Sequence, residues 1–267
     1  MRAGTAAVIA KQITVSKENT VDLQTFFSDH PSVALAFSGG VDSSFLLYAG
    51  MRYGAKIKAY YVKSAFQPEF ELNDARRLAD ELKADLKIIN LDVLASEEVT
   101  ANPADRCYFC KKIIFEAIQQ HAQEDGFTLL IDGSNASDDA GDRPGMRALA
   151  EMSVRSPLRE CGITKPDIRQ LSKEAGLFTW DKPAYACLAT RIPTGRKITS
   201  ELLEKVEAAE NILFAMGFSD FRVRVADDIA RLQLPSEQMY NVIAHREDIL
   251  REFEPYFPSV VLDLVSR

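Results

Sequence analysis

Short apolar runs alternate with amphipathic segments along the first two thirds of the chain. Four runs predict strands buried in a sheet: residues 33–37, 56–62, 86–93 and 127–131. Apolar residues recur at helical spacing in residues 71–82 and 110–122, and another helix is expected directly after the first strand, at residues 45–49. This alternation predicts an α/β domain with a parallel sheet and helices on both faces. Ligands of such sheets bind beyond the carboxyl ends of the strands.

The pattern changes toward the end of the chain. Residues 173–196 are rich in proline, glycine and lysine and lack periodicity, which is typical of a functional loop. Beyond them we expect a helix at 201–216, strands at 221–225 and 229–234, a long helix at 237–253 and a last strand at 260–265. We therefore predict three parts: a main domain at residues 1–182, a cysteine-bearing active-site loop at 183–198, and a small α+β domain at 199–267.

Residues 38–44, Ser-Gly-Gly-Val-Asp-Ser-Ser, lie between the first predicted strand and the first predicted helix. Glycine lets the backbone turn tightly, so that several N–H groups and the positive end of the helix dipole face one anion. The spacing is neither the Walker pattern nor the GxGxxG dinucleotide pattern. An ordinary glycine-rich turn with serine caps is the alternative. The candidates for holding phosphate are Ser38, Gly39, Gly40, Asp42, Ser43 and Ser44.

This loop resembles the PP-loop, SGGxDS, of ATP pyrophosphatases, which cleave ATP between the α and β phosphates and hold the departing pyrophosphate. The resemblance implies a Rossmann-like sheet of the adenine nucleotide alpha hydrolase type, with ATP bound at the loop. A second polar stretch, residues 132–139, follows the fourth predicted strand and should open onto the same crevice. Asp132 and Gly133 are candidate nucleotide contacts there. Asp138 and Asp139 are candidate Mg²⁺ ligands, or simple caps of the following turn.

Composition narrows the class of function. With 267 residues, 46% of them hydrophobic, the chain can form a main domain with a smaller appendage. A net charge of −7 and a pI near 5.2 argue against stable nucleic-acid binding. No apolar run reaches the length of a membrane span and the first 20 residues lack the order of a secretory signal, so we expect a cytoplasmic protein. Its four cysteines then indicate metal binding or thiol chemistry rather than disulfides.

Three further stretches narrow the resemblance: residues 102–111 (NPADRCYFCK), 142–148 (DRPGMRA) and 183–193 (PAYACLATRIP). Together with the PP-loop they resemble the LarE group of ATP-dependent sulfur transferases, over about residues 15–235. That group implies a role in nickel-pincer nucleotide cofactor biosynthesis. ATP adenylylates a carboxylate of a pyridinium-3,5-dicarboxylate mononucleotide, pyrophosphate leaves, and a sulfur nucleophile displaces AMP to give a thiocarboxylate.

The resemblance also implies roles for single residues. Cys187 would be the sulfur centre, and Asp42 a second catalytic residue that ligates Mg²⁺ beside the phosphates. Arg143 and Arg147 are implied as nucleotide contacts. Arginines in the matching motifs would bind the phosphate and carboxylates of a small nucleotide substrate. Two of them, Arg222 and Arg224, are expected on one face of a strand, and the alternative for this pair is a solvated strand face. The arginines are Arg106, Arg191, Arg222 and Arg224.

The cysteines leave several alternatives open. In one branch of the LarE group the protein's own cysteine gives up its sulfur; in another, three cysteines carry a [4Fe-4S] cluster that binds sulfide. Cys107, Cys110 and Cys187 match the three-thiolate pattern of the second branch, which we favour over sacrifice of Cys187. A zinc site completed by Cys161 or His121 is the competing metal hypothesis. Taken alone, Cys161 is typical of a buried small apolar residue.

Other functions stay open on sequence alone. PP-loops also serve tRNA-thiolating enzymes and ammonia-using amide synthetases, and a non-catalytic ATP sensor is a further alternative. The resemblance implies a homo-oligomer. The sequence departs from it at one point, because relatives commonly place a carboxylate after Ala-Arg-hydrophobic, whereas Gln233 follows here. A metal-binding role is therefore not carried over to this position, and Glu210 is the candidate carboxylate near the domain junction.

Overall fold

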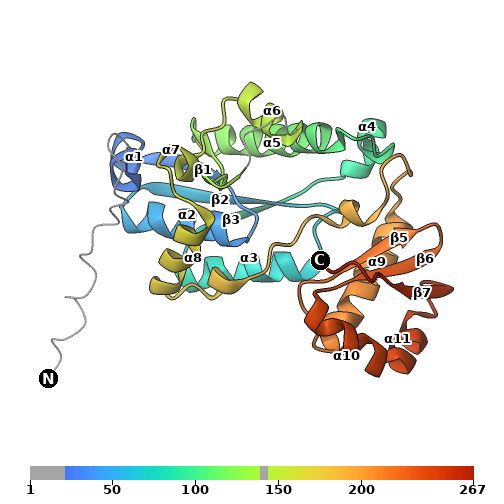
Figure 1. The fold of residues 1–267 in the computed structure, drawn as a ribbon. Helices are drawn as coiled ribbons and strands as arrows, with labels where there is room; N and C mark the ends of the chain where they lie inside the picture. The colour runs from blue at the N-terminus through green and yellow to red at the C-terminus, as the bar shows by residue number, and fades with distance from the viewer. Residues whose placement is uncertain (1–21, 139–143) are drawn as a thin grey trace, which may run out of the picture.

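Two layered units make up the computed structural model, which describes residues 22–138 and 144–267 (Figure 1). The larger unit is a parallel sheet with helices on both faces, and the smaller unit lies beside it with a sheet of its own. A short helix, α1 (Leu23–Asp29), precedes the first strand. Asp139 and Arg143, which the sequence places near ATP, lie outside the described residues.

The main sheet has the strand order β3-β2-β1-β4, and all its pairs are parallel. Leu35 lies opposite Ala59 on one side and Ile131 on the other, which makes β1 a central strand. The parallel α/β architecture predicted from the sequence is confirmed. The strands are β1 (Ser32–Ala36), β2 (Lys56–Lys63), β3 (Asp85–Asn90) and β4 (Leu130–Ile131).

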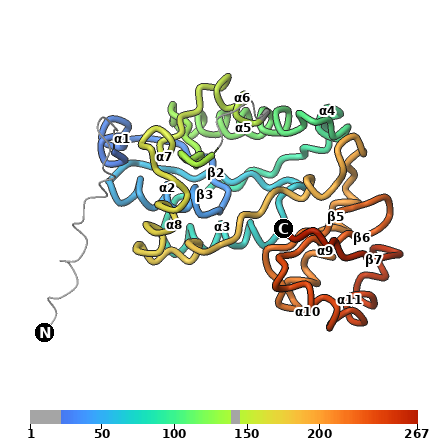
Figure 2. The backbone as a smooth tube through the Cα atoms, in the orientation of Figure 1, coloured from blue at the N-terminus to red at the C-terminus, as the bar shows by residue number. Residues whose placement is uncertain are grey.

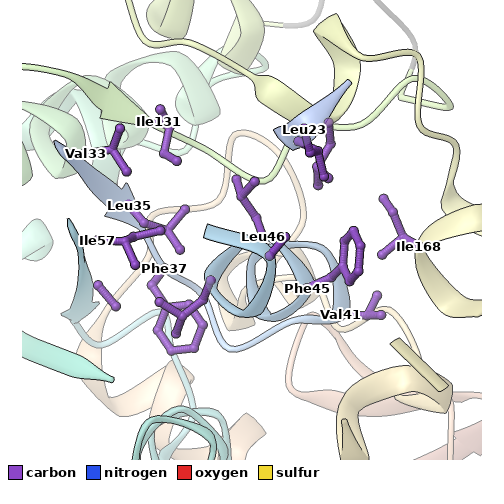
Figure 3. Packing of buried hydrophobic residues seen from close by; sticks show 14 of the residues in the cluster. Leu23, Val33, Leu35, Phe37, Val41, Phe45, Leu46, Ile57, Ile131 and Ile168 are labelled. Carbon is purple, nitrogen blue, oxygen red and sulfur yellow. The ribbon is translucent and has the colours of Figure 1, made fainter. Parts of the chain in front are cut away.

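Helices cover both faces of this sheet, as Figure 1 shows. On one face lie α2 (Val41–Arg52), α3 (Glu69–Leu82) and α8 (Lys165–Glu174); on the other lie α5 (Arg106–Glu124) and α6 (Pro144–Glu151). Leu35, Leu46 and Ile168 belong to the core cluster of the first face (Figure 3). Tyr60 and Phe115 belong to a separate cluster on the second face. Burial from both sides explains why β1 is apolar along its centre.

The smaller unit has a three-stranded sheet of order β5-β6-β7, whose first pair is antiparallel and whose second pair is parallel. Its core contains Val206 and Val223, and it also takes in Leu188, Ala189 and Phe66 from outside the unit. The cysteine loop is therefore packed between the two units. The elements are α9 (Ser200–Ala215), β5 (Arg222–Ala226), β6 (Ile229–Gln233), η4 (Ser236–Gln238), α10 (Met239–Ala244), α11 (Arg246–Phe253) and β7 (Ser259–Leu262).

Short elements connect the larger ones. In the tube view the chain runs from α8 across the molecule to the smaller unit (Figure 2). Before α8, Thr164 and Asp167 form a capping box, which fixes where that helix begins. The short elements are η1 (Val93–Ala95), α4 (Glu97–Thr100), α7 (Pro157–Glu160), η2 (Phe178–Asp181) and η3 (Leu188–Arg191).

Several element boundaries differ from the sequence prediction, and the last strand ends at Leu262 instead of residue 265. The prediction of a single helix at 237–253 is wrong. His245 has φ −98° and ψ 14°, outside the α-helical region, and this residue separates α10 from α11. β3 ends at Asn90 instead of residue 93, because the Asp92 carboxylate accepts a hydrogen bond from the Leu94 N–H at 3.0 Å and starts η1. β4 has two residues instead of five, although Ala34 N still donates to Leu129 O at 2.8 Å.

Candidate active site

The glycine-rich loop joins the end of β1 to the start of α2. Gly39 has φ +71°, and a Cβ there would lie 3.2 Å from the Ala75 Cβ of α3, so the position favours glycine for two reasons. Ser38 and Ser43 place their hydroxyl oxygens 3.1 Å apart across the loop. Gly40 is the N-cap of α2 and has no side chain to cap the first turn, which leaves helix N–H groups for an anion.

The turn after β4 lies directly against this loop. A Cβ on Gly133 would come within 2.9 Å of the Ser43 nitrogen, so glycine allows the two backbones to touch. Asp132 organises the turn, because its carboxylate accepts hydrogen bonds from the Ser134 hydroxyl at 2.6 Å and the Ser156 hydroxyl at 2.7 Å. The expected opening of both segments onto one crevice is found in the structure.

Asp42 lies at the start of α2 and already has two partners. Its carboxylate accepts from Lys165 Nζ at 2.5 Å and from Asn135 Nδ2 at 3.3 Å. Asp138 accepts from the Asn135 N–H at 2.9 Å and so closes the turn before it, whereas the alternative expected from the sequence is a cap of the following turn. Within residues 22–138 and 144–267, no three His, Cys, Asp or Glu side chains are grouped to hold a metal ion.

A cavity of about 460 Å³ extends from the glycine loop to the cysteine loop. The glycine-loop side contributes Ser38, Gly40, Asp42 and Ser43, and the far side contributes Tyr185 and Cys187. Ser44 lies behind the loop, fully buried, with no hydrogen-bond partner for its hydroxyl among the described residues. The structure therefore brings most of the predicted phosphate-binding residues and the predicted sulfur centre to one space.

Three lysines and one glutamate in this cavity were not predicted as site residues. Lys111 from α5, Lys165 from α8 and Lys182 before the cysteine loop all line it, and Lys182 Nζ lies 2.6 Å from the Asp74 carboxylate. Each lysine is charged and its helix or loop has a polar face, so sequence alone does not separate it from a solvated residue. Glu71 on α3 also lines the cavity; its carboxylate has no hydrogen-bond partner among the described residues.

Burial raises the pKa of Glu71 to about 7. The positive charge of Lys182 opposes this rise and the negative charge of Asp74 adds to it. Tyr61, whose hydroxyl is buried with no partner among the described residues, lines the same cavity, and the charge of Glu71 also acts on it. The cavity thus contains an acceptor and a donor that have no partner in the described parts of the chain.

The three candidate cluster cysteines lie on two elements and are not grouped as metal ligands among the described residues. Cys187 is the N-cap of η3, while Cys107 and Cys110 lie in the first two turns of α5. Burial raises the pKa of the Cys110 thiol to about 12, and it also raises the pKa of Cys187. The charges of the neighbouring cysteines add to both shifts. Cys107 is exposed.

The other two zinc candidates lie elsewhere. Cys161 is buried in the core cluster of α2 and α8, where burial raises the pKa of its thiol to about 12. This agrees with its interpretation as a small apolar residue. His121 lies near the end of α5 and pairs with Glu124 at 3.1 Å. Among the described residues, neither is grouped with Cys107, Cys110 and Cys187, so the zinc site that required one of them is not assembled.

The predicted substrate arginines point into the protein and donate to backbone carbonyls of the cysteine loop. Arg106 and Arg222 are 7% and 5% exposed, and Arg191 is 1% exposed. Arg191 also forms an ion pair with Glu210, with 2.8 Å between Nε and Oε1. Arg224 bonds to Gln233, whose amide in turn donates to Asp263 at 2.8 Å.

Arg147 lies away from this group. It stacks on the Tyr108 ring at 4.0 Å and pairs with Glu151 on the exposed side of α6, and it is not among the described residues that line the cavity.

The comparisons with known proteins agree with this geometry. A family described as Thiamine biosynthesis protein (ThiI) matches residues 27–214. An uncharacterized protein of Synechocystis sp. is 36% identical over 249 residues, which cover 91% of this chain and 92% of that protein. The pyridinium-3,5-bisthiocarboxylic acid mononucleotide synthase of Lactiplantibacillus plantarum is 32% identical over 239 residues, covering 88% and 87%. A tRNA-specific 2-thiouridylase of Clostridium botulinum matches more distantly, at 28% identity over 56% of this chain and 52% of its own length.

The sheet, the glycine loop and the family match define an ATP pyrophosphatase of the PP-loop class, which uses ATP. Within that class the chain belongs to the LarE group of ATP-dependent sulfur transferases. None of the described helices is both long and apolar enough to cross a membrane.

The half-buried carboxyl group of Glu71 makes stability depend on pH. Its pKa is raised on folding from 4.5 to about 7, so between these values the folded protein holds a proton that the unfolded chain has lost. The free energy of unfolding should therefore fall as pH rises through this window, by about 2 kcal/mol from this group. Glu71→Gln should remove that part of the pH dependence.

Urea unfolding of both proteins at pH 5 and pH 8 measures the effect. Asp80→Asn on the exposed side of the same helix is the control and should follow the wild type. An identical fall in the wild type and in Glu71→Gln would contradict the assignment.

Proposed function

We propose that this enzyme adenylylates a carboxylate of pyridinium-3,5-dicarboxylate mononucleotide, releases pyrophosphate, and converts the carboxylate to a thiocarboxylate for a nickel-pincer nucleotide cofactor. The observation that carries the proposal is the single cavity shared by the glycine loop and Cys187. A carboxylate is a poor acylating group until one oxygen belongs to a phosphoric anhydride. Activation at one end of the cavity therefore has to precede attack by sulfur at the other.

The phosphate end of the cavity has the groups that departing pyrophosphate requires. The free N–H groups of α2 and the hydroxyls of Ser38 and Ser43 bind and orient the anion. Lys111, Lys165 and Lys182 offset its charge from three different elements. This arrangement stabilises negative charge on the leaving group, which is the main requirement of phosphoryl and nucleotidyl transfer.

Asp42 and Asp138 are the proposed residues for Mg²⁺, because both carboxylates line the cavity beside the glycine loop. Oxygen ligands of this kind suit the ion, which when bound would supply positive charge between the phosphates. The Lys165 ammonium lies 2.5 Å from the Asp42 carboxylate. It can therefore leave Asp42 and bind a phosphate oxygen when ATP is present.

The sulfur end of the cavity contains Cys187. The thiolates of Cys107, Cys110 and Cys187 suit an iron–sulfur cluster chemically, but among the described residues these side chains do not converge as metal ligands, so the fit is incomplete. No step of the reaction is therefore assigned to a cluster. The chain's own contribution is to hold the Cys187 thiol at the cavity, neutral by burial, until an activated carboxylate is present.

We also propose that residues 1–182 form the ATP pyrophosphatase domain, residues 183–198 the active-site loop, and residues 199–267 a substrate and oligomerisation domain of a cytoplasmic homo-oligomer. β5 supports a role of the small unit at the site, since Arg222 and Arg224 reach the cysteine loop. Large apolar side chains left exposed on this unit support oligomerisation. They are Tyr240, Ile243, Leu250, Val261, Leu264 and Val265.

Pyrophosphate release tests the substrate. With ATP and Mg²⁺ present, release should require the pyridinium dicarboxylate mononucleotide, and AMP rather than ADP should accumulate. If pyrophosphate release required tRNA, the protein would be a thiouridylase, and if it required ammonia, an amide synthetase. If ATP bound but no pyrophosphate were released, the protein would be an ATP sensor.

Lys165→Ala tests the phosphate end. We expect kcat/KM for pyrophosphate release to fall about 10- to 100-fold, because one charge-assisted contact to the leaving group is lost. Lys173→Ala at the exposed far end of the same helix is the matched control and should stay near the wild-type value. Equal activity of Lys165→Ala and Lys173→Ala would remove Lys165 from the site.

Mass spectrometry of the protein after one turnover tests the sulfur source. Loss of one sulfur and two hydrogens at Cys187 would identify that residue as the donor and exclude a cluster as the main route. An intact chain that turns over repeatedly, and that binds iron and sulfide only while Cys107 and Cys110 are both present, would exclude sacrifice.

A further inference from the structure

Four arginines hold one short loop by its backbone. Arg106 comes from α5, Arg222 and Arg224 from β5, and Arg191 from the loop itself. The carbonyl oxygens that accept from them span residues 184–190 on both sides of Cys187. The bonds are Arg222 to Ala184 at 2.6 Å, Arg191 to Ala186 at 2.9 Å, Arg106 to Ala189 at 2.9 Å, and Arg224 to Thr190 at 2.7 Å.

Two of these guanidinium groups lack a counter-ion. Within the described parts of the chain, neither Arg222 nor Arg224 pairs with a carboxylate; Arg222 donates to two backbone carbonyls, and Arg224 to one carbonyl and the Gln233 amide. Burial and the nearby charge of Arg191 together lower the pKa of Arg222 to about 10. A buried cation without an anion is unfavourable.

A phosphate group would satisfy this pair better than peptide carbonyls do. Guanidinium donates to phosphate through charge-assisted, often bidentate hydrogen bonds, which are roughly twice as strong as those to neutral acceptors. Arg222 and Arg224 lie two residues apart on one strand, so their side chains project from the same face of β5. One anion on this face can contact both guanidinium groups, and it would compete with the carbonyls of Ala184 and Thr190 for their N–H donors.

We propose that these arginines form a latch on the cysteine loop, and that a phosphate group bound to Arg222 and Arg224 opens it by displacing the carbonyls of Ala184 and Thr190. The source of the phosphate rests on the proposed function, in which it is the phosphate of the mononucleotide substrate. With the latch closed, Cys187 stays half-buried. Opening frees the segment around Cys187 once the substrate has bound. Because the two equilibria are coupled, a protein whose cysteine loop is already open should bind phosphate more tightly than one whose loop is closed.

Alkylation of the full chain by iodoacetamide, resolved by peptide mass spectrometry, tests the latch. Exposed Cys107 is the internal reference for reagent and time. Inorganic phosphate should raise the rate at Cys187 relative to Cys107 severalfold. Arg222→Ala should raise the same ratio by about tenfold without phosphate, as expected when one charge-assisted bond of the closed state is lost, and should abolish the response to phosphate.

Two variants distinguish the latch from an effect of phosphate elsewhere on the protein. Arg231 lies opposite Arg224 in the β5–β6 pair and bonds to Asp263 instead of the loop, so Arg231→Ala should keep the wild-type rate and response. Ser43→Ala weakens anion binding at the glycine loop; if the phosphate response disappears in this variant, the anion acts there and the latch is overturned.

The proposal is also overturned if inorganic phosphate leaves the alkylation rate of Cys187 in the wild type unchanged or lowers it. If Arg222→Ala fails to fold, Arg222→Lys keeps the charge but loses the planar fork, and it should give an intermediate rate with a weaker phosphate response. Alkylation needs no turnover. Its outcome is therefore independent of whether pyrophosphate release requires the pyridinium substrate.

Discussion

The buried ion pair between Arg191 and Glu210 is the interaction on which the site depends. Their side chains are 0% and 1% exposed, and burial alone would lower the pKa of Arg191, yet bonding to Glu210 raises it. The same carboxylate accepts from the Val223 N–H of β5 and from the Tyr185 hydroxyl of the cysteine loop. Removal of one partner from such a pair typically costs about 3–5 kcal/mol, because the other charge stays buried. One glutamate thus fixes the loop to the small unit.

The cavity combines lysines with carboxylates, in a chain whose net charge is −7. Its charged lining residues are Lys111, Lys165, Lys182, Asp42, Glu71, Asp132 and Asp138. An acidic surface repels extended polyanions such as RNA, whereas recessed lysines can still bind the phosphates of a small one. ATP and a mononucleotide are small polyanions. The net charge of the chain therefore favours a small nucleotide substrate over tRNA, even though a thiouridylase is a distant relative.

The sequence allowed prediction of the features that local patterns determine. Buried strands are continuous apolar runs, and the glycine loop is contiguous, so the parallel sheet and the position of Ser38 and Ser43 followed from spacing alone. The direction of an arginine side chain does not follow from spacing, because it depends on which carbonyl or carboxylate the fold brings near. Arg191, which the resemblance implies as a substrate contact, pairs with Glu210 in the structure, and the sequence did not predict this pair. Lys165 was missed for the same reason, since its partner Asp42 is 123 residues away.

Such a latch requires a stable closed state and a small free-energy cost of opening, and the residues of the loop are consistent with both. Leu188 and Ala189 are fully buried in the core of the small unit, and Leu188 N donates to Phe66 O at 2.9 Å, so the end of the loop is anchored. Ala184 and Ala186 are exposed and small, and little apolar area is lost when they move. A ligand shifts such an equilibrium only by its difference in affinity for the two states. A phosphate gains that difference because it neutralises the guanidinium groups of Arg222 and Arg224, which have no counter-ion among residues 22–138 and 144–267 while the loop is closed.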